Sequence, residues 1–151
     1  MADAPALAEF QDIDSAGVTA FAHWMTSHAE SHLPYVADLD GRTVGAAWLL
    51  IAERVPRGHV SARRHGDIQS VMVREQFRAR GIGSALITAL LAEARARRLT
   101  HVTVHSGRRA VAFYLRHGFT HHNQLLLWEP SSPVPPEGDS EPPARGPSRP
   151  A

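Results

Sequence analysis

The sequence contains no cysteine and no lysine. Without cysteine the chain cannot form disulfide bonds, bind a metal through thiolates or use a thiol as a nucleophile. Without lysine it cannot contain a Walker-type phosphate loop, in which a lysine follows the second glycine. All sixteen basic residues are arginine, and a formal net charge of +1 gives no indication of a nucleic-acid partner.

Long apolar runs are absent as well. No stretch approaches the ~20 apolar residues of a transmembrane helix, and residues 1–11 lack the basic and apolar regions of a signal peptide. We therefore expect a cytoplasmic protein without a membrane partner. Its 151 residues are enough for one domain that buries most of its apolar surface.

Composition divides the chain into three segments. Residues 1–14 are small and acidic, and we expect them to be a flexible N-terminus. Residues 15–130 carry the periodic hydrophobic patterns of a folded domain. Residues 131–151 are dominated by proline and polar residues, which cannot bury enough apolar surface to offset the entropy of ordering them. They predict a disordered tail, whose proline-rich turns could bind a partner.

Within the middle segment, hydrophobic patterns typical of helices and of strands follow one another. The predicted helices start at Ser15 and end before Pro34, cover about fifteen residues around Leu86, and cover Gly107–His117. The predicted strands are Tyr35–Leu39, Thr43–Ala52, Asp67–Val73, Thr100–Val104 and Gln124–Trp128. Asp40-Gly41 suits the tight turn of a hairpin between the first two strands. This order of elements predicts a mixed sheet with helices on its faces.

The most informative stretch is the turn between the third strand and the second helix. Here Arg78-Ala79-Arg80-Gly81-Ile82-Gly83-Ser84 leads into the helix. A helix N-terminus offers unpaired N–H groups and the positive end of the helix dipole, so it favours phosphate. Gly81 and Gly83 let an anion approach the backbone, and the two arginines add positive charge. The turn therefore predicts a pyrophosphate site.

The spacing of the glycines separates the families that bind pyrophosphate in this way. A dinucleotide fingerprint needs a third small residue, and Ala85 is out of register for it. The pattern Arg-x-x-Gly-x-Gly, from Arg78 to Gly83, instead resembles the acyl-coenzyme A loop of the GCN5-related N-acetyltransferase (GNAT) family. A second motif of that family, Ala-x-x-Phe-Tyr followed by Gly-Phe, is matched between Ala110 and Phe119. The resemblance covers residues 33–130.

The resemblance implies a fold and a reaction. The fold is α/β (α+β), with a mixed, mostly antiparallel sheet and helices on both faces, and the family's first strand and first helix have no counterpart in this sequence. The reaction is transfer of an acetyl group from acetyl-CoA to a primary amine of a small molecule or peptide. It proceeds by direct attack, without a covalent enzyme intermediate, and no metal is implied.

The resemblance also assigns coenzyme binding. The strand before the turn splays from its neighbour in the family, and its main chain holds the pantetheine arm and could stabilise the oxyanion. Ser106 or Arg108 could replace an asparagine that the family often has at Gly107. The assigned residues are Val71, Met72, Val73, Arg78, Ala79, Arg80, Gly81, Ile82, Gly83, Ser84 and Ser106.

Two catalytic roles follow from the resemblance. Tyr114 corresponds to a tyrosine near the sulfur, where it would help the thiol to leave; from the pattern alone it would be a core aromatic. Many members of the family have a glutamate as general base where this sequence has Gln69, an amide that cannot take the proton. His105, at the end of a strand, is the substitute candidate, with Asp67, Glu53 or a water chain as alternatives.

Departures from the family leave a second hypothesis open. Gln69, Gly107 and the short segment before Tyr35 are compatible with a non-catalytic acyl-CoA-binding module that acts through its tail or a partner. Because the early helices usually shape the acceptor pocket in the family, a homodimer could supply a missing wall. His28 and His32 have the spacing of metal ligands on a helix, but no third ligand accompanies them, and we interpret them as a surface pair.

Overall fold

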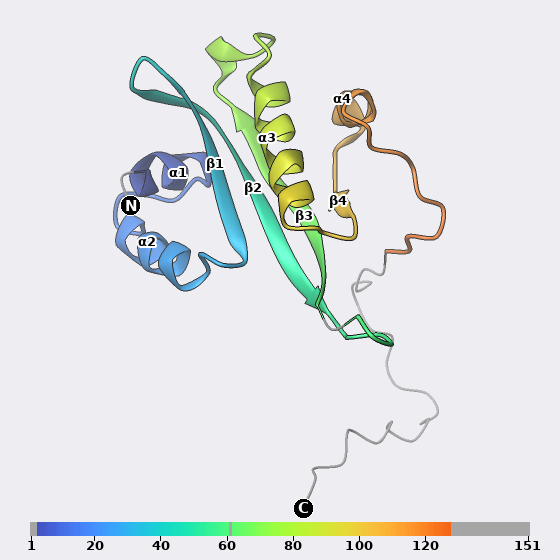
Figure 1. The fold of residues 1–151 in the computed structure, drawn as a ribbon. Helices are drawn as coiled ribbons and strands as arrows, with labels where there is room; N and C mark the ends of the chain where they lie inside the picture. The colour runs from blue at the N-terminus through green and yellow to red at the C-terminus, as the bar shows by residue number, and fades with distance from the viewer. Residues whose placement is uncertain (1–2, 61, 128–151) are drawn as a thin grey trace, which may run out of the picture. The chain divides into compact units, whose positions relative to one another are not determined.

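A computed structural model describes residues 3–60 and 62–127 (Figure 1). The chain divides into two compact units, residues 1–120 and residues 121–151. The elements of the first unit are α1 (Ala4–Phe10), α2 (Val18–Ser27), β1 (His32–Leu39), β2 (Arg42–Arg54), β3 (Arg63–Val73), the 3₁₀ helix η1 (Glu75–Phe77), α3 (Ile82–Ala96), β4 (Val102–Val104), the 3₁₀ helix η2 (Arg108–Ala110) and α4 (Val111–Arg116).

The four strands form one sheet in the order β1-β2-β3-β4. β1 pairs with β2 and β2 with β3 in antiparallel fashion, whereas β3 pairs with β4 in parallel. The predicted hairpin is confirmed: Asp40 and Gly41 have φ of 52° and 76°, and the Gly41 amide donates to Oδ1 of Asp38 at 2.8 Å. The sheet is mixed and mostly antiparallel, as predicted.

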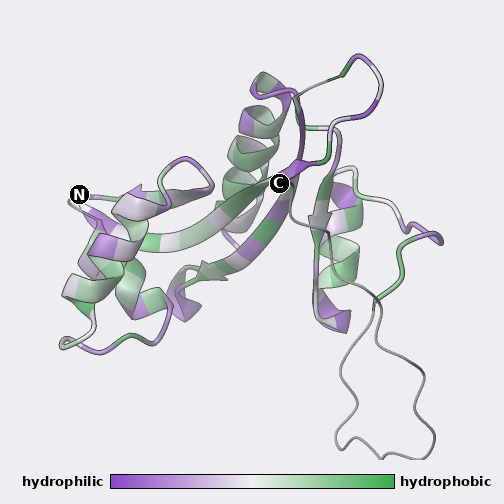
Figure 2. Cartoon of the chain, turned by 90° about the horizontal axis from the view of Figure 1, so that it is seen from below, coloured by the Kyte–Doolittle hydropathy of each residue, from purple (hydrophilic) through white to green (hydrophobic). Residues whose placement is uncertain are grey.

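Helices cover both faces of the sheet, and β2 is buried between them. Residues 44–49 are all buried, because alternate residues of this strand face opposite helical layers. On one face, Ala47 and Leu49 pack in the core that α3 completes with Leu86, Ile87, Leu90 and Ala94. On the other face, Ala46 and Trp48 pack with Ala4, Leu7 and Met25 of α1 and α2. Figure 2 shows hydrophobic and hydrophilic residues alternating around α3, the pattern of a helix with one buried face.

The beginning of the chain differs from the sequence-based expectation. A flexible N-terminus over residues 1–14 is wrong for Ala4–Phe10, which forms α1. Leu7 and Ala8 are 1% and 0% exposed. A proline occupies the first turn, where N–H groups have no partner within the helix, so the missing N–H of proline costs no hydrogen bond. So short a helix is unstable alone and depends on its packing, which periodicity over a few residues does not reveal. Two helices therefore precede β1, one more than predicted.

The next boundaries also differ. The first predicted helix is α2, which begins at Val18 instead of Ser15 and ends at Ser27, well before Pro34. Pro34 lies inside β1, where it is tolerated because β1 is an edge strand. β3 begins earlier than predicted, at Arg63, because it continues its pairing with β2.

The end of the described chain gives one further correction. The helix predicted over Gly107–His117 is present as η2 and α4, and Gly118 follows it with φ of 88°. The predicted last strand is wrong for residues 124–127, which form no strand. An apolar run becomes a strand only where a neighbouring strand pairs with it, and sequence periodicity does not report such a partner. Trp128 and the predicted tail, residues 131–151, lie outside the described residues.

Candidate active site

The predicted pyrophosphate turn leads from β3 into α3. Gly81 caps α3 with φ of 79°, in the left-handed region that glycine adopts without strain. The amide of Ala85 donates to the Gly81 carbonyl at 2.9 Å. The three helical amides before Ala85 have no acceptor within the helix and are available to an anion; they belong to Ile82, Gly83 and Ser84.

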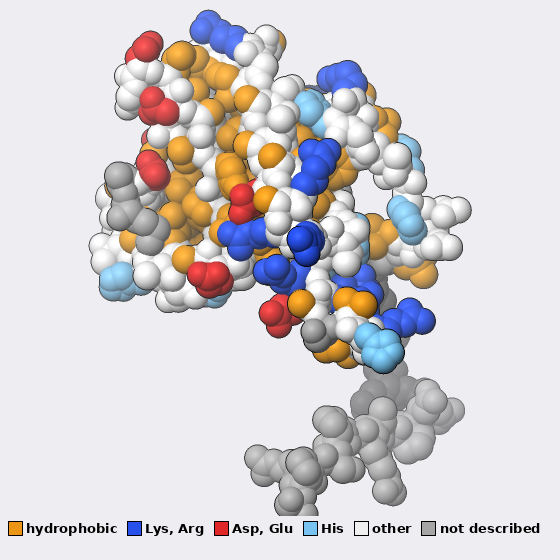
Figure 3. Space-filling model, in the orientation of Figure 1, with side chains coloured by type: hydrophobic (Ala, Val, Ile, Leu, Met, Phe, Trp, Pro, Cys, Tyr) orange, Lys and Arg blue, Asp and Glu red, His pale blue; other side chains and the backbone are white. Residues whose placement is uncertain are grey.

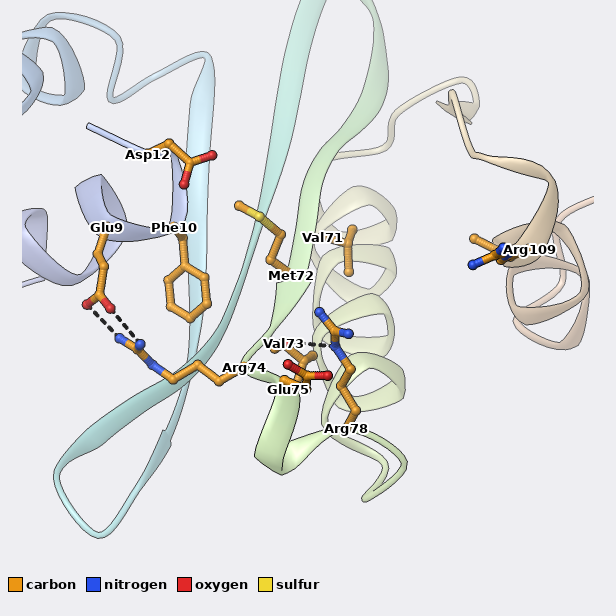
Figure 4. Close-up of a pocket in the computed structure, with 11 residues that line it drawn as sticks. Glu9, Phe10, Asp12, Val71, Met72, Val73, Arg74, Glu75, Arg78 and Arg109 are labelled. Carbon is orange, nitrogen blue, oxygen red and sulfur yellow. Dashed lines mark hydrogen bonds and ion pairs between the residues drawn. The ribbon is translucent and has the colours of Figure 1, made fainter. Parts of the chain in front are cut away.

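A first cleft opens where β3 and β4 separate. Their parallel pairing ends at Ile68 and Val104, whereas β3 continues along β2 to Val73. The cleft beyond this point has a volume of about 720 Å³. It is lined by Glu9, Phe10, Asp12, Val71, Met72, Val73, Arg74, Glu75, Arg78, Arg109 and Ala110 (Figure 4).

The two arginines of the turn occupy different positions. Nε of Arg78 donates to the Val73 carbonyl at 3.1 Å, so its guanidinium turns back along β3 into the first cleft (Figure 4). Arg80 lies over the ring of Phe77 at 5.5 Å. Figure 3 shows acidic side chains gathered mainly on the side of α1, α2 and the hairpin, with arginines over the rest of this face. On this face arginines lie both near the turn and α4 and toward the opposite end of the sheet (Figure 3).

A β-bulge in β3 separates the first cleft from a second one. Trp48 lies opposite Gln69, but Ala46 lies opposite Met72, so two residues of β3 oppose one of β2. Ser70, within the bulge, has φ of 51°. Bulges bend a strand and redirect its side chains, and they are frequent next to active sites.

The second cleft has a volume of about 350 Å³. It is lined by Gln11, Ile13, Phe21, Trp24, His32, Trp48, Gln69 and Ser70. Neighbouring residues of the bulge line the two clefts: Ser70 lines the second and Val71 the first. The Ser70 hydroxyl donates to Oε1 of Gln11 at 3.4 Å, which connects the segment after α1 to β3.

Asp67 and Gln69 form a hydrogen-bonded pair on β3. Oδ1 of Asp67 accepts from the Thr103 hydroxyl of β4 at 2.7 Å, and Oδ2 accepts from Nε2 of Gln69 at 3.2 Å. Both carboxylate oxygens are therefore engaged, and Asp67 lines neither cleft. Of the pair, Gln69 reaches the second cleft.

Tyr114 is 8% exposed and packs edge-to-face against Phe113 and Phe119, with ring centroids 5.2 and 5.4 Å away. Burial raises the pKa of its hydroxyl, so the group is protonated at neutral pH and can donate a hydrogen bond. Tyr114 is not among the residues that line the two clefts.

The other predicted catalytic residues lie at strand ends. His105 and Ser106 follow β4; the first is exposed and the second half-buried, and neither lines a cleft. Glu53 is exposed near the end of β2. The segment after β4 instead brings Arg109 into the first cleft.

Sequence reasoning missed two walls of the clefts. One is acidic and consists of Glu9 and Asp12, which line the first cleft. The other is aromatic and includes Trp24, which lines the second cleft and is 38% exposed although it is large and apolar. The sequence does contain a sign of the aromatic wall. The i, i+4 spacing of Trp24 and His28 brings a tryptophan beside a histidine at the end of α2.

His28 and His32 do not lie on one helix. Their ring centroids are 5.4 Å apart, but His28 follows α2 and His32 begins β1. The described residues contain no group of three or more histidine, aspartate or glutamate side chains that could hold a metal ion. Among the helices of the described part, none is long and apolar enough to cross a membrane.

Known proteins resemble this chain in sequence. The model of the acetyltransferase (GNAT) family matches residues 3–119. Glucosamine 6-phosphate N-acetyltransferase of Trypanosoma brucei brucei is 34% identical over 86 residues, or 57% of this chain and 56% of that protein. The match thus spans little more than half the length of this curated relative.

Solved structures share the fold. A crystal structure of a Trypanosoma brucei acetyltransferase has a TM-score of 0.67 at 25% identity, over 82% of this chain and 87% of that one. A predicted acetyltransferase from Clostridium acetobutylicum, solved with acetyl-CoA, has a TM-score of 0.68 at 14% identity, over 84% and 90%. Because the family match extends over α1, the predicted pyrophosphate turn and the second motif, the chain belongs to the acetyltransferase (GNAT) family.

Proposed function

We propose that the protein transfers the acetyl group of acetyl-CoA to a primary amine by direct attack of the amine nitrogen on the thioester carbonyl. The proposal is based on the position of the predicted pyrophosphate turn beside the first cleft. The turn with the three available amides of α3 borders the first cleft through Arg78. A pyrophosphate and the extended arm attached to it would therefore occupy adjacent sites.

The turn supplies the groups that a pyrophosphate needs. The amides of Ile82, Gly83 and Ser84 would donate to its oxygens, and Arg78 would add a charge. A Cβ at residue 83 would come no closer than 3.5 Å to Phe113, so packing inside the protein does not require glycine there. Close approach of a ligand is a reason for glycine at this position.

The unpaired part of β3 suits the pantetheine arm. Beyond Ile68, the main chain of Val71, Met72 and Val73 is free of the β4 pairing and can bond to amides of the arm as an added strand would. One N–H group there would also stabilise the charge that develops on the carbonyl oxygen. The protonated hydroxyl of Tyr114 would donate to the sulfur as the C–S bond breaks.

Two known proteins support the substrates of this proposal. The 34%-identical relative is named for acetylation of glucosamine 6-phosphate, an amine, and the Clostridium acetobutylicum protein was solved with acetyl-CoA. For this chain the acceptor would be an amine of a small molecule or peptide. The amine site is formed either by one chain alone or by two copies of the chain together. A measurement of the oligomeric state in solution would distinguish these alternatives.

Calorimetry with acetyl-CoA, followed by a thiol-release assay over a panel of amines, tests the proposal. We expect a binding heat for acetyl-CoA and thiol release with at least one primary amine. Binding without thiol release for any amine, including glucosamine 6-phosphate and peptide amines, would favour the non-catalytic acyl-CoA-binding module. The absence of a binding heat would overturn both functions.

A further inference from the structure

The second cleft is built from aromatic rings that come from separate parts of the chain. Trp24 of α2 lies 6.1 Å from Phe21, 6.0 Å from Trp48 of β2 and 4.9 Å from His32 of β1, measured between ring centroids. Its 38% exposure leaves part of this ring surface open to the cleft. No arginine, aspartate or glutamate is among the residues that line it.

Within this apolar wall, the indole N–H of Trp48 has no hydrogen-bond partner among the described residues. The residue is 5% exposed, yet its Nε1–H has no partner within the described part of the chain. Nε2 of Gln11, which also lines the cleft, is buried without a partner in the same part. Because a buried donor without an acceptor costs free energy, these groups indicate a ligand that brings an acceptor atom.

Gln69 offers the complementary group. A carboxylate can only accept, so Asp67 orients the amide of Gln69 with its NH₂ toward Oδ2. The carbonyl oxygen of Gln69 is thereby left for the cleft, and it can accept an N–H from an amine. Ser70, which shares this wall, adjoins Val71 of the first cleft, so an amine held here would be beside the acetyl group.

His32 is the group in this lining that can exchange a proton near neutral pH. Its Nδ1 lies 2.9 Å from the Ser31 hydroxyl, which leaves Nε2 for a ligand. Burial, and then the nearby His28, lower the pKa of His32, so the ring is neutral at pH 7. His28 is the titratable group against this ring, whereas β2 and β3 present uncharged Trp48 and Gln69.

We propose that the second cleft is the binding site for primary amines carried on an uncharged, apolar or aromatic body that can also bear a hydrogen-bond acceptor such as a hydroxyl group, and that His32 takes the proton of the incoming ammonium. This inference rests on the proposed function. His32 Nε2 accepts one proton from the ammonium group and passes it to water. The freed nitrogen forms the C–N bond while the C–S bond breaks, and its second proton ends on the coenzyme sulfur. A sugar phosphate would find no positive side chain in this lining.

Substrate preference gives the first test. We expect kcat/KM for 2-phenylethylamine to exceed that for glucosamine 6-phosphate by about tenfold or more, since one well-buried apolar group discriminates to that extent. Equal values, or a preference for the sugar phosphate, would overturn the inference and leave the acetyltransferase function intact. Acetyl-CoA binding without turnover of any amine in the panel would instead overturn the proposed function.

Variants of the aromatic wall give the second test. We expect Trp24→Ala to raise KM for 2-phenylethylamine about tenfold, while calorimetry finds the acetyl-CoA affinity of the folded variant unchanged. Trp48→Phe keeps the ring and removes the N–H, and we expect it to affect amines that carry a hydroxyl group, such as tyramine, more than 2-phenylethylamine. An unchanged KM for every amine in both variants contradicts the assignment.

The proton transfer is tested by a pH profile of kcat/KM. We expect His32→Gln to lower kcat/KM at pH 7 by about 10² or more. This loss should become smaller as the pH approaches the pKa of the amine, because more of the amine is then already deprotonated and does not need His32 to take its proton. His23→Gln is the matched control, because His23 is an exposed histidine of α2 that lines neither cleft. Identical profiles for His32→Gln and the unmodified protein would exclude His32 as the proton acceptor.

Discussion

The two clefts on either side of the bulge in β3 are built by different means. The first combines main-chain groups with charge: a segment of β3 that β4 does not pair with, and charged side chains that include Arg78, Arg109 and Glu9. The turn into α3 borders it through Arg78. The second consists of rings and uncharged polar groups, with Trp24, Trp48 and Gln69 around a small volume. A site of amides and arginines suits an extended, charged coenzyme, whereas a site of rings suits the body of an apolar amine.

This difference separates two kinds of variant. A change on the side of the first cleft should alter acetyl-CoA binding for every acceptor. A change on the side of the second cleft should alter the response to one amine relative to another. A change to a group that acts only in the chemical step should alter turnover without altering either affinity.

The largest effect in this set is expected for Tyr114→Phe. Removing the hydroxyl should lower kcat by about tenfold to a few hundredfold, because the sulfur loses its proton donor. The acetyl-CoA affinity, measured by calorimetry, should not change. Tyr35→Phe is the matched control, since Tyr35 is the other tyrosine of the sequence, its hydroxyl interacts with Glu93, and it lines neither cleft. Equal rates for both variants and the unmodified protein would exclude Tyr114 from the chemistry.

The next effect concerns the main chain of the turn. Gly81 and Gly41 have nearly the same φ, 79° and 76°, and at both an added Cβ would meet nothing within 4 Å. Alanine at either position should therefore lower the free energy of unfolding by a similar amount, about 1–2 kcal/mol.

Ligand binding distinguishes these two glycines. Gly81→Ala should weaken acetyl-CoA binding about tenfold to a hundredfold, because one charge-assisted hydrogen bond of the turn is worth about 1.5–3 kcal/mol. Gly41→Ala, in the hairpin, should leave the affinity as it is. If calorimetry gives the same affinity for both variants, the turn does not hold the coenzyme.

The same contrast explains what the sequence could and could not predict. The turn beside the first cleft is a contiguous stretch, so the helix start, the glycines of the turn and the strand before it were all predicted from local spacing. Local patterns likewise predicted α3 and, with the Asp40-Gly41 turn, the hairpin. These features are encoded within about fifteen neighbouring residues at a time.

The second cleft could not be predicted in that way. Its lining comes from the segment after α1, from α2 and from three strands, and these segments become neighbours only in the folded chain. The missed helix α1 shows the same limitation, because Leu7 is buried by β2 and α2 and not by its own neighbours in sequence. From the sequence, His105 was the candidate base because it lies at a strand end. His32, which lines the second cleft, was instead interpreted as a surface residue paired with His28.

A smaller effect is expected for the charge in the first cleft. Arg78→Ala should weaken acetyl-CoA binding about fivefold, since a solvent-exposed charge pair contributes about 1 kcal/mol. Arg54→Ala is the control, because it removes the same charge from the exposed end of β2. Salt should reduce the difference between the two variants. If both weaken binding equally, net charge and not the position of Arg78 determines the affinity.

The smallest effect concerns the segment that borders both clefts. Arg74 donates to both carboxylate oxygens of Glu9, at 2.6 and 2.7 Å, and so attaches α1 to β3. This hydrogen bonding lowers the pKa of Glu9 below its ordinary 4.5. The ion pair therefore stabilises the fold fully above pH 4.5 and loses its contribution as pH falls through the lower pKa of the folded state.

Glu9→Gln should consequently lower the free energy of unfolding at pH 7 by only about 0.5–1 kcal/mol, because the Glu9 side chain is 62% exposed. At about pH 3 the difference in urea unfolding should narrow as the carboxylate of the unmodified protein takes up its proton. Glu30→Gln, an exposed residue after α2, should be neutral at both pH values. Residues of α1 and of the segment after it line both clefts, so weaker attachment of α1 in Glu9→Gln should lower the affinities for acetyl-CoA and for the amine together. A lower affinity for only one of the two ligands would mean that the two clefts do not share this wall.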